Sequence, residues 1–356
     1  MALEEKKGVS SSESANSPSI KSIKDKRKIE LNAATLVENI LKQDITALSR
    51  AITLIESKNP KHAQQAKSII QDCLPHANKS IRIGITGVPG VGKSTFIEAL
   101  GQHLTDYGKR VAVLAIDPSS TITKGSILGD KTRMENLAKS ENAFIRPSAS
   151  GESLGGVARK TRETIVLCEA AGFDVIIVET VGVGQSETTV HSMVDFFLLL
   201  KLAGAGDELQ GIKRGIIEMA DAIIINKADG DNLKPAKLAE TEFKRALHLY
   251  PEKASKWPPK VSRCSAINNE GIDQIWKMIL DYAETTTSNG YFEEKRNKQN
   301  EYWLVQTIEE ELKSQFFENP KIKKELKTQL ELLAANKTTP FAAADYLLNL
   351  SLNQPS

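Results

Sequence analysis

A glycine-rich stretch with a lysine and a serine stands near residue 90, between an apolar run and a helical pattern. It reads GVPGVGKS, from Gly87 to Ser94, and fits G-x-x-x-x-G-K-[ST]. The preceding run IRIGIT is typical of a buried strand, and the following TFIEALGQHL is typical of a helix. Strand, loop and helix in this order constrain the fold strongly, because the backbone amides of such a loop surround phosphate at a helix N-terminus.

The residues of this loop have distinct expected roles. The glycines permit close approach of the backbone, and Lys93 is expected to bridge the β and γ phosphates of a nucleotide. Ser94 is expected to give its hydroxyl to Mg²⁺, and Thr95 to contact the region of the α-phosphate. The expected phosphate-binding residues are Gly87, Val88, Pro89, Gly90, Val91, Gly92, Lys93, Ser94 and Thr95. A purely structural glycine-rich turn is the plain alternative, which the flanking strand and helix disfavour.

Short apolar runs alternate with helical stretches from Ile81 onward. The runs are IRIGIT, VAVLAI, AFIRP, DVIIVE, VDFFLLL, DAIIIN and KVSRCSA. Runs that are apolar on both faces suit parallel strands buried between helices. We therefore expect an α/β fold with a doubly wound, mostly parallel sheet, which binds its ligand at the carboxyl ends of the strands.

The run DAIIINKAD predicts which base is bound. It ends in N-K-x-D, from Asn226 to Asp229, an arrangement in which the carboxylate accepts both the N1–H and the 2-amino group of guanine. Adenine has neither donor and would leave the carboxylate unpaired. Asn226 is expected to tie this segment to the phosphate loop, and Lys227 to lie along the base. The backbone amides of Ser265, Ala266 and Ile267 could contact the guanine O6, although a serine after a strand is often only a turn or cap.

A third stretch, DVIIVETVGVGQSE, contains the expected catalytic groups. Glu179 ends the strand as a candidate Mg²⁺ ligand, and the amide of Gly182 could sense the γ-phosphate. Asp117 and Asp130 are further candidates for the metal, with helix caps as the plain alternative. Val183 stands where many signalling GTPases have a glutamine that positions water, so we expect slow unaided hydrolysis.

The amino-acid composition limits which binding partners and which cellular compartment are expected. The 47 Lys and Arg against 45 Asp and Glu leave a charge of +2, so no overall field favours nucleic acid or a membrane. The three cysteines are far apart, no apolar run has membrane-spanning length, and the N-terminus has no apolar signal region. We expect a cytoplasmic protein.

Several long segments together resemble the MeaB/MMAA-type GTPases, also called ArgK-like, of the SIMIBI class of P-loop proteins. The resemblance rests on GVPGVGKST, AIDPSST, GSILGDKTRM, VETVGVGQSE, AGAGDELQGIK and NKAD, in that order between about Ile81 and Ala266. It implies a GTPase chaperone for an adenosylcobalamin-dependent acyl-CoA mutase, typically methylmalonyl-CoA mutase, that gates cofactor loading and protects the enzyme.

The resemblance also implies a homodimer through the C-terminal helices. It further implies that the segment from Ala205 to Lys213 acts as a third switch, with Lys213 activating hydrolysis when the mutase is bound. Gln210 and Lys213 would share one face if this segment is helical; two solvated side chains are the plain alternative.

The expected organisation has four parts: a disordered tail at 1–30, a helical hairpin within an N-terminal extension at 31–78, a GTPase domain at 79–286, and a helical dimerisation region at 287–356. Apolar stripes on the last helices could equally pack on their own domain. The alternatives in function are a small-molecule kinase, a metallochaperone GTPase and a non-enzymatic scaffold. No chemistry is assigned to the glycine-rich segment from Ser148 to Lys160.

Overall fold

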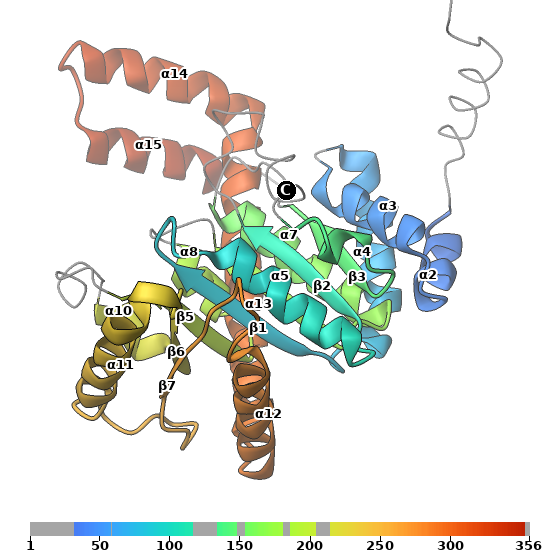
Figure 1. Cartoon of the computed structure of the whole chain (residues 1–356). Helices are drawn as coiled ribbons and strands as arrows, with labels where there is room; N and C mark the ends of the chain where they lie inside the picture. The colour runs from blue at the N-terminus through green and yellow to red at the C-terminus, as the bar shows by residue number, and fades with distance from the viewer. Residues whose placement is uncertain are drawn as a thin grey trace, which may run out of the picture.

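The predicted strands all join one parallel sheet in the computed structural model, which describes residues 32–57, 59–116, 134–147, 154–180, 186–203 and 214–352. Within these ranges the sheet has seven strands in the order β3-β2-β4-β1-β5-β6-β7 (Figure 1). They are β1 (Ile81–Gly87), β2 (Val111–Ile116), β3 (Ala143–Arg146), β4 (Val175–Thr180), β5 (Phe196–Leu202), β6 (Ala222–Asn226) and β7 (Lys260–Arg263). The expected doubly wound α/β class is confirmed.

The chain reverses its direction across the sheet at β1. From β1 it passes over to β2 and β3 on one side, returns to β4, and then continues through β5 on the other side. In such sheets the crevice for a ligand opens at the carboxyl ends of the strands, where the order reverses. The phosphate loop directly follows β1 and therefore lies at this point.

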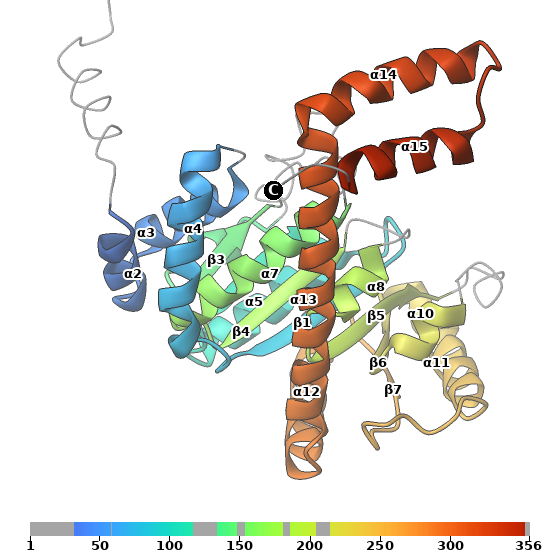
Figure 2. The same ribbon diagram turned by 180° about the vertical axis from the view of Figure 1, so that it is seen from behind.

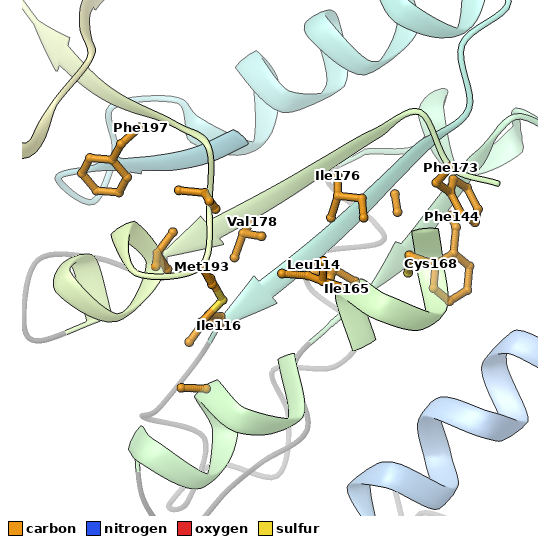
Figure 3. Packing of buried hydrophobic residues seen from close by; sticks show 14 of the residues in the cluster. Leu114, Ile116, Phe144, Ile165, Cys168, Phe173, Ile176, Val178, Met193 and Phe197 are labelled. Carbon is orange, nitrogen blue, oxygen red and sulfur yellow. The ribbon is translucent and has the colours of Figure 1, made fainter. Parts of the chain in front are cut away.

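Helices cover both faces of the sheet, which explains why the strands are apolar on both sides. On one face α5 (Lys93–Asp106) and α12 (Ile272–Ser288) bury side chains such as Phe96 and Ile275 against Ile83 and Ile85 of β1. On the other face lie α7 (Leu154–Ala170), α8 (Ser186–His191), α10 (Arg214–Met219) and α11 (Leu233–Leu247). Figure 3 shows this second core, where Ile176 and Val178 of β4 lie near Ile165 of α7 and Phe197 of β5.

The N-terminal extension has three helices, and the expected hairpin of two is wrong. They are α2 (Ala33–Leu41), α3 (Ile45–Glu56) and α4 (Pro60–Cys73). The apolar pattern from Leu36 to Ile55 predicts one helix as the first arm of the hairpin. That helix breaks because Gln43 takes a left-handed φ of 68° and the side chain of Asp44 accepts a hydrogen bond from the amide of Thr46, which caps α3. A short 3₁₀ turn, Leu74–His76, then leads to β1.

The extension is attached near the carboxyl edge of the sheet. Arg146, the last residue of β3, pairs with the carboxylate of Glu56 at 2.5 Å. Lys160 of α7 donates to the backbone oxygen of Glu56 at 2.7 Å. The described part of the unassigned segment Ser148–Lys160 is thus the start of α7, and one of its side chains holds the end of α3.

The described C-terminal residues after α12 are helical, as expected, and form three helices. They are α13 (Tyr291–Glu318), α14 (Pro320–Ala334) and α15 (Pro340–Leu352). The first half of α13 packs on the face that carries α7 and α8, where Trp303 joins the core. The pair α14 and α15, here called the C-terminal arm, projects away from the sheet (Figures 1 and 2).

None of the helices placed by the structure combines the length and the apolar character needed to span a lipid bilayer.

Candidate nucleotide-binding site

The phosphate loop requires glycine at Gly92, the last of its glycines. Gly92 has a φ of 91° and directly precedes α5. A side-chain carbon at Gly92 would lie 2.8 Å from Nδ2 of Asn226. Both the left-handed backbone and this close approach therefore require glycine. The loop is thereby brought against the segment that follows β6.

Lys93 lies over its own loop. Its Nζ donates to the backbone oxygen of Gly87 at 2.8 Å and to that of Val88 at 3.4 Å. Burial lowers the pKa of Lys93, while the carboxylates of Glu179 and Glu187 act in the opposite direction. Because this ammonium is half-buried, its electrostatic attraction to a bound phosphate would be stronger than between the same charges in bulk water.

Ser94 and Thr95, the last two residues of the expected phosphate-binding set, lie in the first turn of α5. Ser94 is half-buried and Thr95 is exposed. The amides at this helix N-terminus lack partners within the helix, which suits an anion.

Asn226 joins three segments of the site. The side chain is 1% exposed, and its Nδ2 donates to the backbone oxygen of Val91 at 2.9 Å. Its Oδ1 accepts from Sγ of Cys264 at 3.3 Å and from the amide of Ala266 at 3.4 Å. The expected tie between this segment and the phosphate loop is therefore present.

The base-reading residues lie together after β6 and β7. Lys227 has a left-handed φ of 56°, and its Nζ donates to the backbone oxygen of Gly90 at 2.9 Å. The hydroxyl of Ser265 donates to the carboxylate of Asp229, which is half-buried. Ile267 is 76% exposed beside them. The lysine stem, the carboxylate and the apolar side chain are thus available to a flat ligand.

Glu179 is the next-to-last residue of β4 and lies beside the phosphate loop. It is 6% exposed and is aligned with Ile85 of β1 in the sheet. The next residue, Thr180, donates its hydroxyl to that of Thr86 at 2.9 Å, which holds the two strand ends together. A buried carboxylate at this edge supplies the oxygen ligands that Mg²⁺ prefers.

Five of the predicted site residues lie outside the described residues. They are Asp117, Asp130, Gly182, Gln210 and Lys213. Their proposed roles toward nucleotide and metal stay predictions.

Two side chains at the site were missed by sequence reasoning. Glu187, in the first turn of α8, is 1% exposed and lies within electrostatic reach of Lys93. Its position in the segment VETVGVGQSE was the available signal. Cys264 orients the amide of Asn226, and burial, together with the charge of Asp229, raises its pKa to about 12. Only the pairing of β7 with β6 brings that thiol to Asn226.

Comparison with known proteins shows to which family the chain belongs. A family model described as "Methylmalonyl Co-A mutase-associated GTPase MeaB" matches residues 48–321. The chain belongs to the MeaB family of GTPases. The resemblance found in the sequence motifs is confirmed.

Curated relatives agree with this assignment. A probable GTPase of Mycobacterium tuberculosis is 49% identical over 309 residues, which cover 86% of this chain and 92% of that protein. The GTPase ArgK of Escherichia coli is 47% identical over 313 residues, covering 87% and 95%. The methylmalonic aciduria type A homolog of Mus musculus, a mitochondrial protein, is 42% identical over 323 residues, covering 88% and 78%.

A solved structure shares the fold. The crystal structure of an LAO/AO transport system kinase superposes with a TM-score of 0.71 at 38% identity, covering 91% of this chain and 99% of that one. The two chains therefore share the parallel sheet with its flanking helices.

Proposed function

We propose that this protein binds and hydrolyses GTP with Mg²⁺ and acts as a chaperone for an adenosylcobalamin-dependent acyl-CoA mutase. Methylmalonyl-CoA mutase is the partner that the family description names. In this role the GTPase gates loading of the cofactor and protects the mutase. The proposed binding of a guanine nucleotide rests on one observation: Asn226 holds the phosphate loop against the strand end that is followed by Asp229.

Guanine is selected by the carboxylate of Asp229. The carboxylate accepts the N1–H and the 2-amino group, while the stem of Lys227 covers one face of the ring. The amide of Ser265 donates to the backbone oxygen of Glu270 at 3.0 Å, and the amide of Ala266 donates to Oδ1 of Asn226. Of the three amides expected at O6, that of Ile267 is therefore the one proposed to contact it. Adenine would offer no donor to the carboxylate, and an unsatisfied group of this kind costs about 1 to 3 kcal/mol.

The phosphates occupy the loop from Gly87 to Thr95. Lys93 exchanges its contacts with the loop carbonyls for the β and γ phosphates, and its fixed charge stabilises the transferring phosphoryl group. The amide of Gly182 contacts the γ-phosphate. Val183 supplies no group to orient the attacking water, so turnover of the isolated protein is slow.

The oxygen atoms of Ser94 and Glu179 fit Mg²⁺. Hard oxygen ligands and retained water are what this ion prefers, and when bound it neutralises charge on the phosphate oxygens. Within the described ranges no three acidic, His or Cys side chains cluster as metal ligands. Asp117 and Asp130 belong to the proposed set as further candidate carboxylates.

The C-terminal helices form the proposed homodimer. Apolar side chains are exposed on α13 from its middle onward and on the arm: Leu304 at 63%, Leu312 at 61% and Phe341 at 83%. Burying such a surface against a second copy is favourable. The boundary of this region at residue 287, and the cytoplasmic location, belong to the same proposal.

A kinase is the second candidate, because the solved relative is named as one. A phosphotransferase acting with ATP would need the adenine base in the site. The carboxylate of Asp229 disfavours adenine, so the two candidates predict opposite nucleotide preferences.

Isothermal titration with GTP, GDP, ATP and ADP decides between them. We expect the guanine nucleotides to bind at least about tenfold more tightly, which corresponds to about 1.4 kcal/mol. Asp229→Asn should shift the preference toward xanthosine nucleotides, whose 2-oxo group accepts from an amide. Equal affinity for GTP and ATP in the unmodified protein would contradict the proposal.

A further inference from the structure

The long helix α13 connects the opposite edges of the molecule. It begins near α12 and the amino ends of the strands, crosses the face that carries α7 and α8, and bears the C-terminal arm at its other end (Figure 2). Its contacts differ along its length.

The start of α13 is held by buried charges at the amino edge of the sheet. Arg296 donates from Nε and Nη2 to the two oxygens of Asp195, at 2.8 and 2.7 Å. Its guanidinium also donates to the backbone oxygens of Asn78 and Ser80, at 2.9 and 2.7 Å. Lys295 donates to the backbone oxygen of Asp195 at 2.6 Å. This many directional bonds in a buried place set the direction of the helix.

The middle of α13 contacts the end of α8. Trp303 is 8% exposed, and its indole Nε1 donates to the backbone oxygen of Ser192 at 3.1 Å. Ser192 directly follows α8, a helix that begins six residues after β4 ends. The first turn of α8 contributes Glu187, which lies near Lys93. The same short helix therefore faces the phosphate loop at one end and α13 at the other.

The next part of α13 contacts the first turn of α7. A side-chain carbon at Gly155 would lie 2.2 Å from Oε1 of Glu310, so this carboxylate rests directly on the glycine backbone. A carboxylate at a helix N-terminus is favoured by the helix dipole. Helix α7 begins eight residues after β3 ends and carries Lys160, which holds the N-terminal extension.

We propose that α13 couples the nucleotide edge of the sheet to the C-terminal arm. The coupling runs through the contact of its Trp303 with the end of α8 and the contact of its Glu310 with the start of α7. The buried charges hold its start, so a displacement of α7 or α8 when nucleotide changes reorients the outer half of α13 and the arm beyond it. The coupling is reciprocal: whatever binds the arm changes the affinity for nucleotide by the same factor. This inference rests on the proposed binding of GTP and GDP.

Spin-label distances measure the coupling directly. Labels are placed at Lys237→Cys on α11 and Lys327→Cys on α14, both exposed positions, in the full chain. The three native cysteines are buried and should not be labelled. Mixing with excess unlabelled protein removes distances between subunits. The distance distribution is recorded with GDP and with a non-hydrolysable GTP analogue, and the binding of both is measured on the same samples by titration.

We expect the mean distance to differ between the two nucleotides in the chain that carries only the labels. The difference should be lost or reduced in Glu310→Gln and in Trp303→Phe, which removes the indole donor but keeps an aromatic ring. Gly155→Ala should act like Glu310→Gln, since its methyl pushes the flexible carboxylate away. The matched control is Glu311→Gln, the same chemical change at an exposed neighbour, which should keep the full difference.

Two outcomes would overturn the coupling. One is a distance that does not depend on nucleotide in the presence of saturating ligand. The other is an unchanged difference in both Glu310→Gln and Trp303→Phe. Failure of both nucleotides to bind would instead contradict the proposed GTPase function, so the two failures are distinguishable.

Discussion

Lys93 is a charge held partly out of water at the carboxyl edge of the sheet. Burial lowers its pKa, and the nearby carboxylates of Glu179 and Glu187 keep the charged form favourable. Its Nζ contacts only carbonyl oxygens of its own loop in the hydrogen bonds described above. To reach a phosphate, the side chain would exchange these two hydrogen bonds for contacts with phosphate oxygens.

Lys93→Ala should reduce GTP hydrolysis by about two to three orders of magnitude, the usual effect of removing one group that stabilises transition-state charge. The thermal midpoint should change little, because the side chain packs over the loop rather than in the core. Single-turnover hydrolysis and a circular dichroism melt separate the two effects. Undiminished hydrolysis would show that the phosphate assignment is wrong.

At the scale of elements, α13 is attached to the sheet by buried charges. Burial would raise the pKa of Asp195, but the hydrogen bonds and charge of Arg296 and the charge of Arg82 outweigh it and hold the pKa below its ordinary value. A carboxyl whose pKa is lowered in the folded state stabilises the fold at pH values above its unfolded pKa of about 3.9. This contribution is lost as the pH falls from there through the folded-state pKa.

The free energy of unfolding should therefore fall as the pH is lowered below about 4. Asp195→Asn should have a shallower pH dependence and a lower stability at neutral pH, by about 3 to 5 kcal/mol, because Arg296 stays buried without its partner charge. Urea denaturation across the pH range measures both. Asp106→Asn, at an exposed position on α5, is the control. A variant with the same acid sensitivity as the unmodified chain would count against this role of Asp195.

At the scale of the molecule, the arm can be removed without opening the core. Its own buried residues, such as Ile322 and Leu347, pack within the arm and against the outer end of α13. A cut after Gly290 would also remove Arg296 and Trp303 from the GTPase core, whereas a cut after Asn319 spares them.

The chain truncated after Asn319 should be a folded monomer that still binds GDP, if the arm forms the proposed dimer interface. Light scattering gives the mass of the full and the truncated chain, and titration gives their affinities for GDP. A truncated chain that stays dimeric would locate the interface elsewhere.

A mutase partner should stimulate hydrolysis. Because Val183 stands where other GTPases have a water-positioning glutamine, we expect slow hydrolysis by the isolated protein. A cation placed on the transferring phosphoryl group raises the rate by about 10³ to 10⁵ in other GTPases. Hydrolysis is measured with and without methylmalonyl-CoA mutase, for the unmodified chain and for Lys213→Ala. We expect stimulation that the variant loses. No binding to any adenosylcobalamin-dependent mutase would contradict the chaperone role and leave the GTPase assignment standing.

The sequence by itself determined the strands, the sheet class and the nucleotide motifs. Local patterns suffice for these, because a strand buried on both faces and a loop such as Gly87 to Ser94 have a composition that few other structures share. The break between α2 and α3 escaped this reasoning, since the apolar period continues across Gln43 and only the left-handed backbone there ends the helix.

Only the tertiary structure decided which distant groups meet. The thiol of Cys264 reaches Asn226 because β7 pairs with β6, and Arg296 reaches Asp195 because α13 crosses the amino edge of the sheet. The contact of Glu310 with Gly155 joins residues that no local pattern relates. Sequence periodicity reports which side of an element is buried, whereas the partner it meets depends on the packing of the whole chain.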